Sequence, residues 1–151
     1  MRVSVENLDK KNKLPIQRRI VRSAVIYLLR LLKIKQAQVN LYFITNQRIK
    51  MLNRLYLKRD YPTDVLAFNL NNSKKNILAE VFISLKTVRE NARFYKNSYP
   101  LEILLCIVHA LLHILGFKDN TEKNKKVILK KQESLLEKLS SYLYKKYKLI
   151  I

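Results

Sequence analysis

The chain of 151 residues contains no tryptophan, one glycine, one cysteine and two histidines. The single cysteine, Cys106, has no partner for an internal disulfide, so a reducing compartment is expected. A chain of this length buries enough apolar surface to be stable without a disulfide. The scarcity of glycine and tryptophan, beside abundant lysine, isoleucine, asparagine and tyrosine, is typical of A/T-biased coding.

The sequence also lacks an export signal and a clear membrane span. The first residues, MRVSVENLDKKNK, are charged and have no apolar core of a signal peptide. The longest apolar run, 103–117, is shorter than the about 20 residues of a membrane span and includes both histidines. We therefore expect a cytoplasmic protein with no membrane partner.

Acidic residues are few, because 11 Asp and Glu stand against 31 Lys and Arg and leave a net charge of +20. Such an excess attracts polyanions and favours nucleic acid or a ribosome as the partner. Biased coding would also raise the number of lysines, although it would not place them. The charge therefore supports a nucleic-acid partner and says nothing about the chemistry.

Hydrophobic periodicity predicts four strands and five helices without repeats or linkers. The strands are expected at 2–7, 39–44, 64–70 and 78–84. The helices are expected at 16–32 after Pro15, 46–57, 85–95, a buried helix through 103–115 after a break at 97–100, and from Asn120 or Thr121 to the C-terminus. This order predicts one α+β domain over 1–151: a small mixed four-stranded sheet covered by about five helices, with a buried central helix that carries the histidines.

Both histidines and the glycine lie in one string, HALLHILGFKD, which runs from His109 to Asp119. Imidazoles four residues apart on a helix lie on one face, about 6 Å apart along the axis, and can share a metal ion. Gly116 predicts a left-handed helix stop, after which the chain would return Asp119 toward the two rings. The alternative is a pair of hydrogen-bonded core histidines followed by an ordinary helix stop.

The predicted ligands are therefore His109, His113 and Asp119, and the expected cofactor is one divalent ion, most favourably Zn²⁺. An ion with three protein ligands keeps a position for water and activates it for hydrolysis. Glu122 is a second carboxylate that could substitute, and Cys106 is a weaker candidate for an extra ligand. A peptidase of the HExxH type needs a glutamate after the first histidine, and Ala110 stands there.

Several blocks of the sequence resemble the YbeY family of metal-dependent endoribonucleases. HALLHILGFKD is similar to the family pattern H-G-x-L-H-L-x-G-Y-D-H, and LNRLYLKRDYPTDVLAF at 52–68 is similar to L-N-x-x-Y-R-x-x-D-x-P-T-[DN]-V-L-S-F. LAEVFIS at 78–84 resembles L-G-D-I-x-I-S, and Gln132 with Glu133 resembles the Q-E of the last helix. The resemblance implies a single-strand-specific endoribonuclease that acts in maturation of the 16S rRNA 3′ end and in ribosome quality control.

The chain departs from the family patterns at positions that bear on chemistry. Asp119 stands where the family has its third histidine ligand, and a carboxylate lowers the charge of the site by one, which makes bound water less acidic and a harder ion such as Mn²⁺ more competitive. Leu57 stands where the family has an arginine, and Ala79 and Ala110 replace two glycines. Lys58 or Arg59 lies near enough to replace the lost cation.

The resemblance and the charge together imply rRNA and the ribosome, or its small subunit, as partners, with no DNA expected. The candidate RNA-contacting residues are Arg54, Lys58, Arg59, Arg89 and Arg93. Asp60, Thr63 and Asp64 match the family pattern, and for the last two we favour a role in turn hydrogen bonding. Two other functions remain open: a non-catalytic RNA- or ribosome-binding protein with a degenerate metal site, and, less favoured, a peptidase-like hydrolase.

Overall fold

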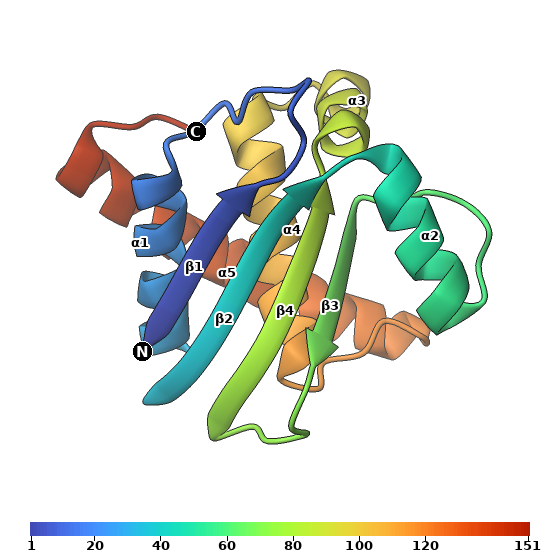
Figure 1. The fold of residues 1–151 in the computed structure, drawn as a ribbon. Helices are drawn as coiled ribbons and strands as arrows, with labels where there is room; N and C mark the ends of the chain where they lie inside the picture. Colours follow the sequence, from blue (N-terminus) through green and yellow to red (C-terminus); the bar gives the residue numbers. More distant parts are fainter.

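A computed structural model describes residues 1–151, and its four strands form one mixed sheet in the order β1-β2-β4-β3 (Figure 1). β1 (Arg2–Asn7), β2 (Gln36–Ile44) and β4 (Asn76–Ser84) run parallel to one another. β3 (Val65–Asn69) pairs antiparallel with β4 and forms one edge of the sheet. The predicted small mixed four-stranded sheet is therefore confirmed.

Alternation along β2 determines which face of the sheet is buried. Ala37, Val39, Leu41 and Phe43 are buried, whereas the residues between them are exposed or half-buried. Because successive strand residues point to opposite faces, the buried set defines the core face. Helices α1 (Arg18–Leu31), α4 (Tyr99–Ile114) and α5 (Glu122–Tyr147) cover this face (Figure 1).

The two remaining helices lie toward the β3 side and the ends of the strands. α2 (Asn46–Leu57) places Ile49 in a small second cluster with Ile44 and Leu66, together with aromatic side chains of the opposite face of the sheet. α3 (Leu85–Tyr95) follows β4 directly and is capped by Ser84, whose hydroxyl accepts a hydrogen bond from the Thr87 amide. The count of five helices agrees with the prediction.

Helix α4 is the central element of the core. Ten of its 16 residues are buried, as expected for a helix that is apolar almost all round. Ser98 caps its first turn, and Pro100 lies at the second residue of the helix, where a missing amide N–H costs no internal hydrogen bond. The predicted buried central helix is thus confirmed.

The predicted starts of four elements need correction, those of α1, α4, β2 and β4. α1 begins at Arg18 after the N-cap Gln17, so Pro15 lies in the preceding bend and not in the helix. α4 begins at Tyr99 after the N-cap Ser98, so the last two residues of the predicted break at 97–100 already belong to the helix. β2 and β4 begin at Gln36 and Asn76, earlier than predicted, because these residues pair with each other and pairing is invisible in the periodicity of one strand.

None of the helices taken singly has both the length and the apolar composition needed to cross a membrane. Helices α3 and α4 meet that test only as a pair, and the chain bends by 113° between them.

Candidate metal centre

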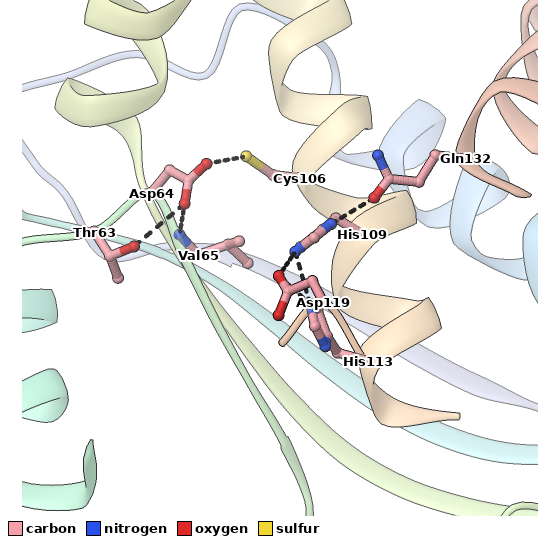
Figure 2. Close-up of polar contacts among 8 residues, drawn as sticks. All are labelled: Thr63, Asp64, Val65, Cys106, His109, His113, Asp119 and Gln132. Carbon is pink, nitrogen blue, oxygen red and sulfur yellow. Dashed lines mark hydrogen bonds and ion pairs between the residues drawn. The ribbon is translucent and has the colours of Figure 1, made fainter. Parts of the chain in front are cut away.

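The two histidines project from the C-terminal half of α4 toward one side of the helix (Figure 2). Both are half-buried, with side chains 31% and 32% exposed, although most of the helix around them is buried. Their spacing of one helical turn brings the two Nε2 atoms to 2.7 Å from each other. The core therefore fixes the helix, and the helix presents both imidazoles at its accessible edge.

Gly116 ends the helix and turns the chain back toward the histidines. Its φ of +95° is a conformation that glycine adopts without a Cβ clash. The Gly116 amide donates to the carbonyl of His113, and the Phe117 amide donates to the carbonyl of Leu112, which is the hydrogen-bond pattern of a Schellman motif. The predicted left-handed stop is confirmed, and Asp119 follows the turn.

Asp119 completes a group of three possible ligands. Its Oδ2 atom lies 3.5 Å from His113 Nε2 and 3.8 Å from His109 Nε2 (Figure 2). The ligand atoms of the three residues all lie within 4.8 Å of one another. Neighbouring donors of a tetrahedral zinc ion are about 3.4 Å apart, so these separations fit one ion after small side-chain movements.

Gln132 on α5 orients the first ligand. Its Oε1 atom accepts a hydrogen bond from His109 Nδ1 (Figure 2). A histidine that donates through Nδ1 keeps the lone pair on Nε2, which is the nitrogen that faces His113 and Asp119. The sequence analysis assigned Gln132 no role, and the only signal for it was its match to the final block of the family pattern.

The surroundings of His113 favour a neutral ring. Burial lowers the pKa of its imidazole and the adjacent His109 lowers it further, whereas the Asp119 carboxylate opposes the shift. The contact between the two Nε2 atoms is then a hydrogen bond from His113 to His109. Binding of a metal ion must displace this proton, as metal binding to histidine generally does.

A cleft of about 990 Å³ opens beside the ligand group. α4 forms one wall, and β3 with the loop before it forms the other. On that second wall the Asp64 carboxylate accepts hydrogen bonds from the Val65 amide at 2.8 Å and the Thr63 hydroxyl at 3.3 Å. These contacts agree with the turn role expected for Thr63 and Asp64.

Cys106 links the two walls of the cleft. Its Sγ atom lies 3.6 Å from Asp64 Oδ2, and burial, reinforced by the nearby carboxylate, raises the pKa of the thiol well above its usual value. A protonated thiol is a hydrogen-bond donor and a poor ligand. Cys106 therefore lies outside the ligand group, and the extra-ligand hypothesis is not supported.

The other predicted site residues are spread over the surface. Glu122 is exposed, lies outside the group of three ligands and pairs with Lys125 at 3.6 Å. Arg59 lines the cleft, as does Leu57, which is 46% exposed. The remaining RNA candidates are exposed and lie outside the cleft lining on or beside α2 and α3: Arg54, Lys58, Arg89 and Arg93. Their contact with RNA stays a prediction.

The α+β fold and the His-His-Asp group beside a cleft define the class of small metal-dependent hydrolases. The family model described as Endoribonuclease YbeY matches residues 4–140, and the chain belongs to this family. The resemblance inferred from the sequence blocks is thereby confirmed.

Individual relatives cover most of the chain. An endoribonuclease YbeY of Aster yellows witches'-broom phytoplasma (strain AYWB) is 37% identical over 114 residues, covering 72% of this chain and 78% of the relative. One of Syntrophus aciditrophicus (strain SB) is 30% identical, covering 94% and 92% of the two chains. A solution structure of a protein from Thermotoga maritima, 26% identical, superimposes with a TM-score of 0.64 over 97% of this chain and 93% of that one.

Replacement of Gly116 by alanine tests the turn. The added Cβ would meet only the flexible end of Lys74, at 3.1 Å, so the cost arises from the left-handed backbone. We expect Gly116→Ala to lower the free energy of unfolding by about 1–2 kcal/mol, with a fall in Tm of about 2–8 °C in thermal denaturation. Gly116→Asn should lose less, because asparagine tolerates this conformation better. Equal stability of wild type and Gly116→Ala would contradict the turn assignment.

Replacement of Gln132 by alanine tests the orientation of His109. Loss of the carbonyl partner leaves the imidazole free to rotate and to change tautomer, so zinc affinity should fall about 10- to 100-fold. Competition with a chromophoric chelator measures the affinity. Glu133→Ala, one residue further and exposed, serves as the control and should bind zinc like the wild type. Unchanged affinity of Gln132→Ala would show that the contact does not orient the ligand.

Proposed function

We propose that the chain is a single-strand-specific, metal-dependent endoribonuclease that hydrolyses phosphodiester bonds with a metal-activated water. The observation that carries the proposal is the group of His109, His113 and Asp119 beside a large cleft. Membership of the YbeY family and a net charge of +20 support RNA as the substrate. The relatives named above carry the name of endoribonuclease.

We further propose that this activity serves maturation of the 16S rRNA 3′ end and ribosome quality control in the cytoplasm. The partners would be rRNA and the ribosome or its small subunit, and the chain would act as one domain over 1–151. The support is the family and the charge, because a polycation is drawn to the phosphate backbone of rRNA independently of sequence.

The ligand set suits one divalent ion, most favourably Zn²⁺. Such an ion supplies Lewis acidity and lowers the pKa of a coordinated water. The residues of the chain hold and tune the site: Gln132 fixes the tautomer of His109, and Asp119 adds a negative charge that a third histidine would not. The carboxylate therefore favours a harder ion such as Mn²⁺ more than three imidazoles would.

Arg59 and Asp64 both line the cleft, and we propose different roles for them. Arg59 is the RNA candidate that lines the cleft and is placed to contact a phosphate there. Asp64 is occupied by three hydrogen bonds, so we assign it to holding the loop and Cys106 and not to proton transfer.

One observation favours the second candidate, a non-catalytic RNA- or ribosome-binding protein. Leu57 lines the cleft where the family pattern carries an arginine, so one cation for the scissile phosphate is lost. The peptidase alternative remains disfavoured because Ala110 is buried on α4 and offers no base. Turnover of single-stranded RNA by the metal-loaded protein separates these functions.

Removal of the third ligand tests the site directly. Asp119→Ala leaves two imidazoles, so we expect the metal content after dialysis to fall to a small fraction and RNA cleavage to fall at least about 100-fold. Elemental analysis and a cleavage assay on single-stranded RNA measure the two effects. Glu122→Ala removes an exposed carboxylate nearby and should change neither. If Asp119→Ala retains both metal and activity, the ligand assignment is wrong.

Introduction of an arginine at position 57 tests whether the lost cation limits activity. The Leu57 side chain is nearly half exposed at the cleft, so Leu57→Arg buries no charge. We expect kcat/KM for single-stranded RNA to rise on the order of tenfold, since a cation at a phosphoryl centre stabilises developing charge. Leu57→Gln, which is polar but uncharged, should give no such gain. A lack of gain with arginine would show that another cation already serves this phosphate.

A further inference from the structure

A second surface, remote from the metal centre, lies where α1 meets the C-terminal half of α5 (Figure 1). We call it the α1–α5 groove. Tyr27 of α1 lies on one side of it, and the other residues lie on α5. The groove is lined by Tyr27, Lys138, Ser141, Tyr142, Lys145 and Lys146. It shares no lining residue with the cleft that holds the candidate metal ligands.

The two segments that form the groove carry cations and no acids, and the exposed Glu137 lies directly before the segment on α5. Helix α1 has no aspartate or glutamate, and no acidic residue follows Glu137 in the chain. The cations of these two segments are Arg18, Arg19, Arg22, Arg30, Lys138, Lys145, Lys146 and Lys148. None of them forms an ion pair within the molecule, so their charge is available to a partner.

Hydrogen bonds hold part of this charge in place. Lys146 Nζ donates to the Tyr142 hydroxyl at 3.1 Å and to the Ser23 hydroxyl at 3.3 Å. The ammonium is charged at neutral pH in any case, and these two hydrogen bonds fix its position. An ammonium group held in this way loses less conformational entropy when it binds an anion.

Aromatic rings form the floor of the same region. Tyr27 and Tyr142 stack with their centroids 4.0 Å apart and an interplanar angle of 2°. The guanidinium of Arg19 and the ammonium of Lys146 each lie over the ring of Tyr147, at 5.6 Å and 5.4 Å from its centroid. These contacts between rings and cations hold positive charge at the surface, where it can contact the phosphates of a nucleic-acid strand.

Helix α5 connects the groove to the cleft. Leu129 and Gln132 line the cleft, and Lys138 and Lys145 lie further along the same helix in the groove. The 13 residues from Gln132 to Lys145 span about 20 Å along the axis. Because Lys138 and Lys145 are also turned by about 120–140° around the helix from Gln132, a stacked strand that rises about 3.4 Å per nucleotide needs more than about six nucleotides to reach from one to the other.

We propose that the α1–α5 groove is a second RNA-binding surface, which holds the phosphate backbone of the substrate outside the cleft. The identity of the ligand rests on the proposed endoribonuclease function, whereas the anionic chemistry rests on the groove itself. An anionic membrane is less suited to it, because its lining is lysine, serine and tyrosine with no aliphatic side chain to enter a bilayer.

The test compares two double variants of equal charge. The groove variant, Lys138→Gln/Lys145→Gln, removes two groove cations whose side chains form no hydrogen bond or ion pair within the molecule. The control variant, Lys35→Gln/Lys75→Gln, removes two exposed cations outside both the groove and the cleft.

Steady-state cleavage by the metal-loaded proteins is measured on single-stranded RNAs of about 20 and about four nucleotides. For the long RNA the groove variant should show a raised KM with unchanged kcat. For the short RNA, which cannot reach the groove, it should match the wild type.

Binding of the long RNA is measured in parallel on proteins that also carry His113→Ala, so that cleavage does not interfere. If each of the two lysines contacts one phosphate, the slope of log Kd against log salt should fall by about 1.4 in the groove variant. Between 1 M and 0.1 M salt, the wild type should then gain about 25-fold more affinity than the variant. The control variant should retain the wild-type slope.

The outcomes separate this proposal from the proposed function. If the two double variants change KM and the salt slope equally, or the groove variant changes neither, the groove is not an RNA-binding surface. Cleavage of the short RNA would then remain as evidence for the nuclease. Groove-dependent RNA binding without cleavage by the wild type would support the groove and overturn the nuclease. Groove-dependent binding to phosphatidylglycerol vesicles, with RNA binding unaffected by the groove variant, would overturn the RNA assignment in favour of a lipid surface.

Discussion

The candidate site depends on the close approach of Asp119 to two imidazoles, and that approach depends on how α4 ends. Ten residues of the helix are buried, so its position and rotation are fixed by the core and the histidines cannot turn away without unpacking it. The Schellman hydrogen bonds at Gly116 then determine the direction in which the chain leaves. The turn at Gly116 therefore brings Asp119 to the two histidines of the core helix and forms the candidate ligand group at the edge of the cleft.

The replacement of an imidazole by a carboxylate changes the electrostatics of the whole site. In a chain of net charge +20, Asp119 is one of only 11 acids, and its oxygen faces both rings. Burial and the neighbouring His109 lower the pKa of His113, whereas the Asp119 carboxylate opposes this shift. Asp119 lowers the positive charge that a bound ion would bring into the cleft, and this weakens attraction of the phosphate at the site itself. For the proposed RNA substrate, this gives more weight to cations further out, such as Arg59 on the wall of the cleft.

The parts of the molecule that sequence reasoning could predict are those with local causes. β1 and α2 begin and end where predicted, and α5 begins directly after its cap Thr121, because alternation, helical spacing and caps are written in neighbouring residues. The grouping of the three candidate ligands could also be predicted, since a spacing of four residues and a glycine helix stop are local features. Pairing of β2 with β4, by contrast, joins segments 40 residues apart and extends both strands beyond their own pattern.

The contacts that sequence reasoning missed join distant parts of the chain. His109 meets Gln132 across 23 positions, Cys106 meets Asp64 across 42, and Ser23 meets Tyr142 across 119. Two of these contacts depend on the packing of α5 against α4 and α1, and the third depends on the packing of α4 against the start of β3. Helix α5 both contacts the candidate ligand His109 through Gln132 and carries the lysines of the α1–α5 groove. The packing of α5 against both α1 and α4 therefore fixes where the groove lies relative to the candidate metal centre.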